Sequence, residues 1–269
     1  MFRLLYCVAL LTVVVAPAEV CAATPAPPSA AEEAATYKHC LDLASKHPQA
    51  ARFFARAWER AGGAHPAEHC AAAAYFGLGK YKKAALLFDR LAAEIGKTKA
   101  PRSLRAHLLD QGGEAWLMAA DTVRATADLG AALTLLPNDP GILVDRAQVE
   151  AMSGNFGGAV GDLDRVLEKH PKRLDALIYR ASAYRALGRL GPALADADKA
   201  LALSPRSLPA LLERGNIRRL EGDIAGARAD WRRILKFAPK SAAAEAAAAN
   251  LARLGKEKPA AAGKAAKRP

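Results

Sequence analysis

An internal repeat of 34 residues is the feature that most restricts what this chain can fold into. Pro137, Pro171, Pro205 and Pro239 are spaced by 34 residues each. Four further columns keep the same step: Ala125, Ala159, Ala193 and Ala227; Asp128, Asp162, Asp196 and Asp230; Ala120, Gly154, Gly188 and Gly222; and Gly112, Arg146, Arg180 and Arg214. A period of this length with two helical patterns per unit predicts a solenoid of helix pairs.

Each column has a physical reason in such a unit. The glycine ends the first helix, where a left-handed backbone conformation is needed. The alanine five residues later lets the second helix approach the first closely. The proline follows the second helix, because it cannot extend the helical hydrogen bonds. The Arg column falls on first helices and the Asp column on second helices, so we expect them to pair within the stack rather than to bind a ligand.

Composition agrees with an all-α chain. Of the 269 residues, 52% are apolar and only 6% are aromatic. Alanine carries much of the apolar fraction, and alanine suits closely packed helices. The chain has 39 Lys plus Arg against 27 Asp plus Glu, a net charge of +12. This excess predicts an acidic partner surface or serves solubility.

The spacing of these residues resembles the tetratricopeptide repeat family, here of an exported type. The hallmark positions of one unit are occupied by Leu177, Tyr184, Gly188, Ala193, Ala200 and Pro205. The earlier unit keeps the same internal spacings with Tyr75, Gly79, Tyr81, Ala84, Phe88 and Leu91. The resemblance implies a right-handed superhelical solenoid of antiparallel helix pairs, with first helices lining a concave groove. It implies a protein that binds other proteins and has no catalytic activity or cofactor.

These patterns divide the chain into an ordered series of segments. Residues 65–241 hold five repeat units, preceded by a divergent helix pair and followed by a capping helix. The segments are 1–23 signal peptide, 24–30 linker, 31–64 divergent helix pair, 65–98, 106–139, 140–173, 174–207 and 208–241 repeats, 242–254 capping helix, and 255–269 disordered basic tail. The insertion around Gly96 to Arg105 predicts a longer loop between the first two units.

The N-terminus predicts export. Arg3 is followed by an apolar run from Leu4 to Ala16, which is too short to span a bilayer and is typical of a cleaved signal peptide. Cleavage is expected after Ala22 or Ala23. The mature chain would then be periplasmic or secreted.

Cleavage would leave two cysteines in the mature chain. Cys40 and Cys70 remain in an oxidising compartment, so a disulfide is the natural interpretation, with two buried thiols as the alternative. Because each cysteine follows a histidine, a metal site is conceivable, but adjacent helical residues point about 100 degrees apart. We expect no metal.

No catalytic motif supports an enzyme. The string from His65 to His69 matches the H-x-x-E-H zinc-peptidase pattern. Pro66 is expected at the first helical position, which would leave His65 outside the helix and remove the spacing that two ligands need. Phosphate-binding, dinucleotide and nucleophile-elbow motifs do not occur in the sequence. We therefore expect no cofactor and no catalytic residues.

Helical spacing predicts which side chains line the groove. They lie on four successive first helices: His107, Asp110, Glu114 and Leu117; Val144, Gln148 and Ala151; Asp175, Ile178, Ser182 and Arg185; and Leu212, Asn216 and Arg219. We expect them to bind another protein or an extended peptide, with Arg185 and Arg219 favouring a partner of acidic character. Of the residues with which some family members clamp a peptide carboxylate, only Asn216 is present.

Two other functions are compatible with the charge pattern. The middle of the chain, 101–173, is acidic, whereas 174–254 and the tail are basic. The basic end could attach the protein to an anionic membrane or cell-wall surface. The protein could also be an accessory subunit of an envelope enzyme. Nucleic acid is not expected as a partner of an exported protein.

Overall fold

The structure is a computed structural model that describes residues 28–256, with side chains to residue 254. The regular elements in that range are thirteen α-helices. Their bounds are α1 Ala30–Lys46, α2 Pro48–Arg60, α3 Ala64–Gly77, α4 Tyr81–Ile95, α5 Arg102–Met118, α6 Thr122–Leu135, α7 Pro140–Met152, α8 Phe156–Lys169, α9 Leu174–Ala186, α10 Leu190–Leu203, α11 Leu208–Glu221, α12 Ile224–Phe237 and α13 Ala242–Lys256.

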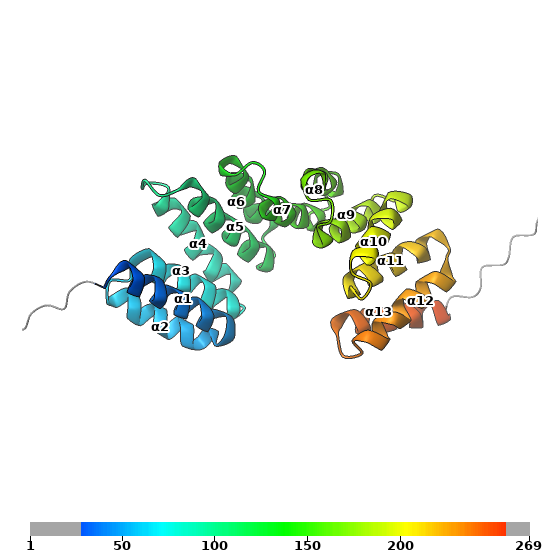
Figure 1. Ribbon diagram of the computed structural model, residues 1–269, viewed down its shortest axis with the longest axis horizontal. Helices are drawn as coiled ribbons and strands as arrows, with labels where there is room; N and C mark the ends of the chain where they lie inside the picture. The colour runs from blue at the N-terminus through cyan, green and yellow to red at the C-terminus, as the bar shows by residue number, and fades with distance from the viewer. Residues whose placement is uncertain (1–27, 257–269) are drawn as a thin grey trace, which may run out of the picture.

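The helices pack in consecutive pairs and form an arch, with α1 to α3 at one end and α11 to α13 at the other (Figure 1). The predicted all-α solenoid is confirmed. The predicted signal peptide, 1–23, lies outside the described residues, as do most of the linker and of the basic tail.

Two segment boundaries differ from the sequence-based prediction. The loop after α4 is shorter than the predicted Gly96 to Arg105, because α5 already begins at Arg102, directly after Pro101. Proline there fixes an extended backbone at the N-cap and does not interrupt the helix that follows. At the other end α13 continues to Lys256, two residues past the predicted limit of the cap.

Local capping explains why the helices end where they do. Asp121, Asp139, Asn155 and Asp223 accept backbone N–H bonds at the starts of α6, α7, α8 and α12. The turn after each first helix contains a residue with positive φ. In four units it is glycine, as at Gly188 with φ 72°, but in one unit it is Ala120 with φ 61°. Ala120 therefore occupies a conformation that costs an L-residue roughly 1 kcal/mol.

Small buried side chains set the distance between paired helices. The alanine column on the second helices is completely buried at Ala84, Ala125, Ala159, Ala193 and Ala227. The odd-numbered helices also contact one another in succession from α5 to α13, whereas within residues 28–256 no two even-numbered helices make comparable contact. The odd-numbered helices therefore line the inner side of the arch, where neighbouring units are closest.

Arginine–aspartate ion pairs connect helices within and between the later units, and we call them the arginine ladder. The guanidinium of Arg180 donates to Asp196 at 2.7 and 2.8 Å, in the same unit, and to Asp164 of the preceding unit at 2.6 Å. Arg214 makes the equivalent bonds to Asp230 and Asp198, and Arg146 binds Asp162. The Arg and Asp columns therefore pair within the stack.

One position of the ladder has no arginine. Gly112 occupies it, and a Cβ there would lie 2.9 Å from Asp89 Oδ1 and 3.2 Å from Asp128 Oδ2. Asp89 is the ninth residue of α4, as Asp164 is of α8, so both acidic partners of a ladder arginine are present. Burial and the neighbouring Asp89 raise the pKa of Asp128 to about 8. The indole of Trp116 donates to Asp89 Oδ2 at 3.0 Å and partly replaces the missing guanidinium.

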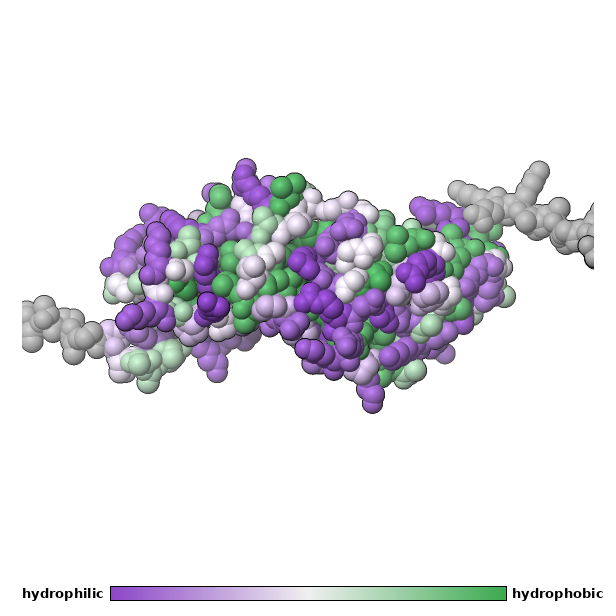
Figure 2. Space-filling model, turned by 90° about the horizontal axis from the view of Figure 1, so that it is seen from above, coloured by the Kyte–Doolittle hydropathy of each residue, from purple (hydrophilic) through white to green (hydrophobic). Residues whose placement is uncertain are grey.

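The outer face mixes polar and apolar groups. Viewed from above the arch, hydrophilic residues run along the whole length and are interspersed with smaller hydrophobic areas (Figure 2). Exposed apolar side chains include Val123 and Met152. No helix in the described part of the chain is both long and apolar enough to cross a membrane.

Candidate functional site

The candidate site is the inner surface of the arch, which α5, α7, α9 and α11 present. The predicted groove residues lie on these four helices, although Val144 is buried in the core and contributes no surface. Asp110, Gln148, Ile178 and Ser182 are partly exposed, and Glu114 is exposed. The prediction that Val144 lines the groove is wrong, because its side chain packs between helices rather than toward the inner surface.

A further column of inner residues was not predicted from the sequence. Its members follow the Asp110 column by one residue: Gln111, Asp145, Tyr179 and Glu213. Gln111 Oε1 accepts from His69 Nε2 of α3 at 2.7 Å, and Glu213 accepts from Arg185 of α9 at 2.5 Å. The column therefore bridges neighbouring inner helices. Its four side chains differ in type, so the repeat of residue identities gave no signal for it, and only its position beside the Asp110 column could have indicated it.

The centre of the inner surface is acidic. Asp110 on α5 and Asp145 on α7 lie close enough for each carboxyl to act on the pKa of the other, and Asp110 Oδ1 is a buried oxygen without a hydrogen-bond partner. Burial, reinforced by Asp145, Asp139 and Glu114, raises the pKa of Asp110 to about 7. Burial and Glu114 raise the pKa of Asp145 to about 6, even though Arg173 opposes the shift. Acidic groups are therefore concentrated here in a poorly solvated environment, which makes ionising all of them together unfavourable.

Two cavities lie on either side of this acidic centre. One, of about 290 Å³, is lined by residues of α1, α3 and α5, among them Leu41, Phe76 and Glu114. The other, of about 440 Å³, lies between α9 and the start of α11, where Ile178 and Tyr179 form part of its wall. Both are mainly apolar, so the inner surface combines apolar hollows with charge.

The C-terminal part of the groove differs from the expectation. Arg185 was predicted to be free for a ligand, but Glu213 accepts from its Nε at 2.5 Å and neutralises it. Asn216 Oδ1 accepts from Asn250 of the capping helix at 3.0 Å. Only Arg219 is exposed as predicted. Sequence reasoning missed Glu213 because it lies in the column that was not recognised.

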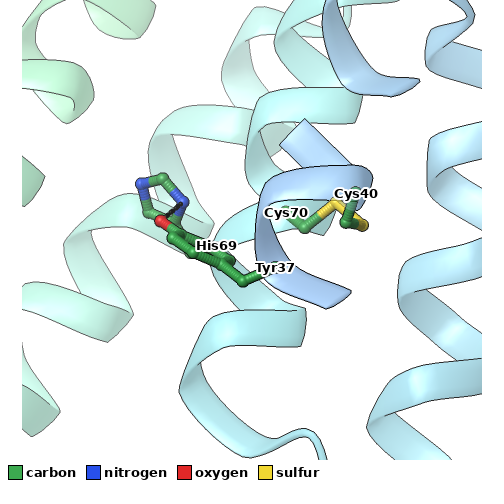
Figure 3. The surroundings of a disulfide bond; sticks show 4 residues. All are labelled: Tyr37, Cys40, His69 and Cys70. Atoms are coloured by element: carbon green, nitrogen blue, oxygen red, sulfur yellow. Dashed lines mark hydrogen bonds between the residues drawn. A yellow bond between two sulfur atoms is a disulfide. The ribbon is translucent and has the colours of Figure 1, made fainter. Parts of the chain in front are cut away.

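The two cysteines form a disulfide between α1 and α3. Cys40 and Cys70 are completely buried and their Cα atoms are 6.0 Å apart. Beside the disulfide, Tyr37 Oη lies 2.9 Å from His69 Nδ1 (Figure 3). Both ring nitrogens of His69 thus have hydrogen-bond partners, the second being Gln111. Burial lowers the pKa of His69, which favours the neutral ring.

The start of α3 corrects one detail of the sequence argument. The helix begins at Ala64, so His65 lies inside its first turn rather than outside it. Its Nε2 is 3.1 Å from Glu94 Oε2, whereas His69 binds Tyr37 and Gln111. The two imidazoles are therefore held by different partners. Within residues 28–256 no group of three or more His, Cys, Asp or Glu side chains could hold a metal ion.

Comparison with solved structures identifies the fold. A tetratricopeptide repeat protein from Parabacteroides merdae superposes with a TM-score of 0.68 at 18% identity, over 82% of this chain and 87% of that one. The chain has the tetratricopeptide-repeat fold. A thermophilic tetratricopeptide repeat protein from Thermus thermophilus superposes with a TM-score of 0.57 at 19% identity, over 70% of this chain and 100% of that one.

A third structure with this fold is part of a larger assembly. A chain of the APC/C hetero-tetramer Cut9-Hcn1 superposes with a TM-score of 0.59 at 15% identity, over 81% of this chain and 46% of that one. No protein-family model matches the sequence, and the search of curated proteins found no match. The tetratricopeptide-repeat assignment therefore rests on the three-dimensional arrangement of the helices together with the residue columns.

Proposed function

We propose that this chain is a non-catalytic scaffold that binds another protein, or an extended peptide of it, along the inner surface of the arch. The observation that carries the proposal is the acidic centre between two apolar cavities. Placing the partly buried carboxyl groups of Asp110 and Asp145 close together, beside the exposed Glu114, is unfavourable for the isolated fold. Residues that destabilise a fold in this way tend to lie at functional sites.

The cell envelope is the proposed location. The N-terminal segment predicts export, and the buried disulfide between Cys40 and Cys70 would persist in an oxidising compartment. The intact mass of protein purified from its native host should correspond to a chain beginning at Ala23 or Thr24. Recovery of the chain with Met1 retained would contradict export.

A photo-crosslinking amino acid tests where the partner binds. It is placed at Gln148 on the inner surface of α7 or, as the matched control, at Lys199, which is exposed on α10. After irradiation in the native host, Gln148 should yield a crosslinked protein of defined mass and Lys199 should not. Crosslinks from Lys199 alone would show that the partner uses the outer surface and would contradict the proposal.

An acidic partner in the groove, at Arg185 and Arg219, remains a prediction, and the second candidate function places an anionic surface against the basic C-terminal end. Arg232, Lys236 and Lys240 are exposed near the end of α12, where an anionic membrane or cell-wall polymer could bind. Sedimentation with anionic vesicles tests this second function. Replacing these three residues with glutamine should abolish it without affecting the Gln148 crosslink.

A further inference from the structure

From α3 onward, four side-chain contacts join neighbouring inner helices. In chain order they are His69 with Gln111, Asp110 with Asp145, Arg185 with Glu213, and Asn216 with Asn250. Three of them pair a hydrogen-bond donor with an acceptor or join opposite charges. The contact of Asp110 with Asp145 brings two acidic groups together. Of the four contacts, the one between α5 and α7 is therefore the one without electrostatic complementarity.

The surrounding charges do not compensate for this contact. The groups that act on Asp110 or Asp145 include Glu114 on α5, Asp139 at the start of α7 and Asp175 on α9. The cation among them is Arg173, whose guanidinium binds both oxygens of Asp175 at 2.9 and 3.0 Å. Five carboxyl groups thus face one guanidinium, which is already paired.

An aromatic ring lies beside the acidic centre. Tyr179 is 38% exposed, and both Asp175 and Asp145 are close enough to raise the pKa of its phenol, after burial. The ring also lines the cavity of about 440 Å³. An exposed aromatic face next to carboxylates suits a lysine or arginine side chain, which gains both ion pairing and a cation–π contact.

We propose that the inner surface of α5, α7 and α9 binds a basic segment of the partner protein, with a lysine or arginine paired to both Asp110 and Asp145 and lying beside Tyr179. Charge complementarity identifies the occupant, and the flanking cavities accept apolar side chains on either side of the cation. This proposal rests on the proposed function and adds the chemistry of the partner. It assigns to the groove a charge opposite to that expected from the +12 charge of the whole chain.

A pair of synthetic peptides tests the charge preference. The first is a short, end-capped fluorescent peptide in which leucines flank several lysines, and its twin carries glutamates in place of the lysines. Fluorescence anisotropy at low salt should show the lysine peptide binding at least about tenfold more tightly than its twin. The affinity should rise from about pH 5 to about pH 8, because Asp110 and Asp145 ionise over that range.

Two double variants locate the binding. Asp110→Asn with Asp145→Asn should weaken the lysine peptide by about tenfold or more and remove the rise with pH. The matched control, Glu168→Gln with Glu245→Gln, removes the same charge from exposed positions of α8 and α13 and should change the affinity less than about twofold. Equal or tighter binding of the glutamate peptide, no binding of either peptide, or unchanged binding by the asparagine variant would each overturn the inference.

The outcome separates this inference from the proposed function. If Gln148 still crosslinks to a native partner but the peptides show no preference for lysine, the scaffold function stands and the basic ligand is wrong. If crosslinks arise only from Lys199, the groove itself is not the binding surface, and both proposals fail.

Discussion

The two halves of the arch hold their helices together by different means. From α1 to α4 the structure contains a buried disulfide and a series of aromatic contacts, and the described aromatic pairs all lie between Tyr37 and Phe88. From α7 to α12 the helices are instead joined by bidentate Arg–Asp pairs, from Arg146 with Asp162 to Arg214 with Asp230. The two systems meet at α5, where Gly112 occupies the arginine position.

This difference shows that the same helix-pair geometry tolerates two kinds of contact. Covalent and apolar contacts need no particular partner charge, so the first half can depart from the repeat columns. The ladder depends on both partners, because a buried carboxylate is stable only when a cation or a proton neutralises it. At Gly112 the cation is missing, and the proton remains on Asp128 to about pH 8.

Removing the disulfide should have the largest effect. Cys40→Ser with Cys70→Ser opens a loop closed across 30 residues, which on the chain-entropy model destabilises the fold by about 3.5 kcal/mol. The loss should be confined to the first half. Hydrogen exchange should accelerate in α1 to α3 and remain unchanged in α9 to α12, and a uniform acceleration would show that the halves are not independent.

Breaking the ladder should affect the other half. Arg180→Ala leaves Asp196 buried without its cation, which should cost about 3 kcal/mol. Lys199→Ala, at an exposed position of α10, is the control and should change stability by less than about 0.5 kcal/mol. Urea denaturation measures both. Equal effects of the two variants would show that the buried pair has no special role.

Extending the ladder into the first half should stabilise it. Gly112→Arg supplies the missing guanidinium, and we expect a gain of about 2 kcal/mol at about pH 8 if Asp89 shifts to admit the side chain. The size of this stabilisation depends on pH. Because the folded-state pKa of Asp128 is raised to about 8 from 3.8, its contribution in the natural chain is greatest at low pH and is lost as pH rises between these values.

Arginine should remove that pH dependence, because a guanidinium favours the ionised form of Asp128. Thermal denaturation at about pH 5 and about pH 8 should therefore show a larger stabilisation by Gly112→Arg at the higher pH. A larger gain at the lower pH would contradict the assignment of the proton to this pair.

Replacing the positive-φ residue in the turn after a first helix should have the smallest effect on stability. Ala120→Gly relieves an unfavourable backbone conformation and should stabilise the fold by about 1 kcal/mol. The reciprocal change, Gly188→Ala, should destabilise it by a similar amount. If both changes are neutral in urea denaturation, the turn after the first helix is not under strain in either half.

The repeat columns predicted the fold because each column is determined by local structure, such as a turn or a contact between two helices. Gly188 is required by one turn and Ala193 by one contact between paired helices. Such turns and contacts recur every 34 residues. The groove was harder to predict. Arg185 has the spacing of a surface residue, and its pairing with Glu213 depends on how the next unit is rotated. Asp145 was missed because its column holds side chains of four different types, so the repeat does not reveal it.

The disulfide also gives the N-terminal cap a closed covalent topology. Cys40 and Cys70 enclose the whole of α2, so a protease that cuts once between them leaves two fragments that remain joined. Because both cysteines precede α4, the ring can close as soon as Cys70 has been synthesised and oxidised. The first structured surface on which later repeats stack could thus be in place before those repeats emerge, giving assembly of the array a direction from its N-terminal end.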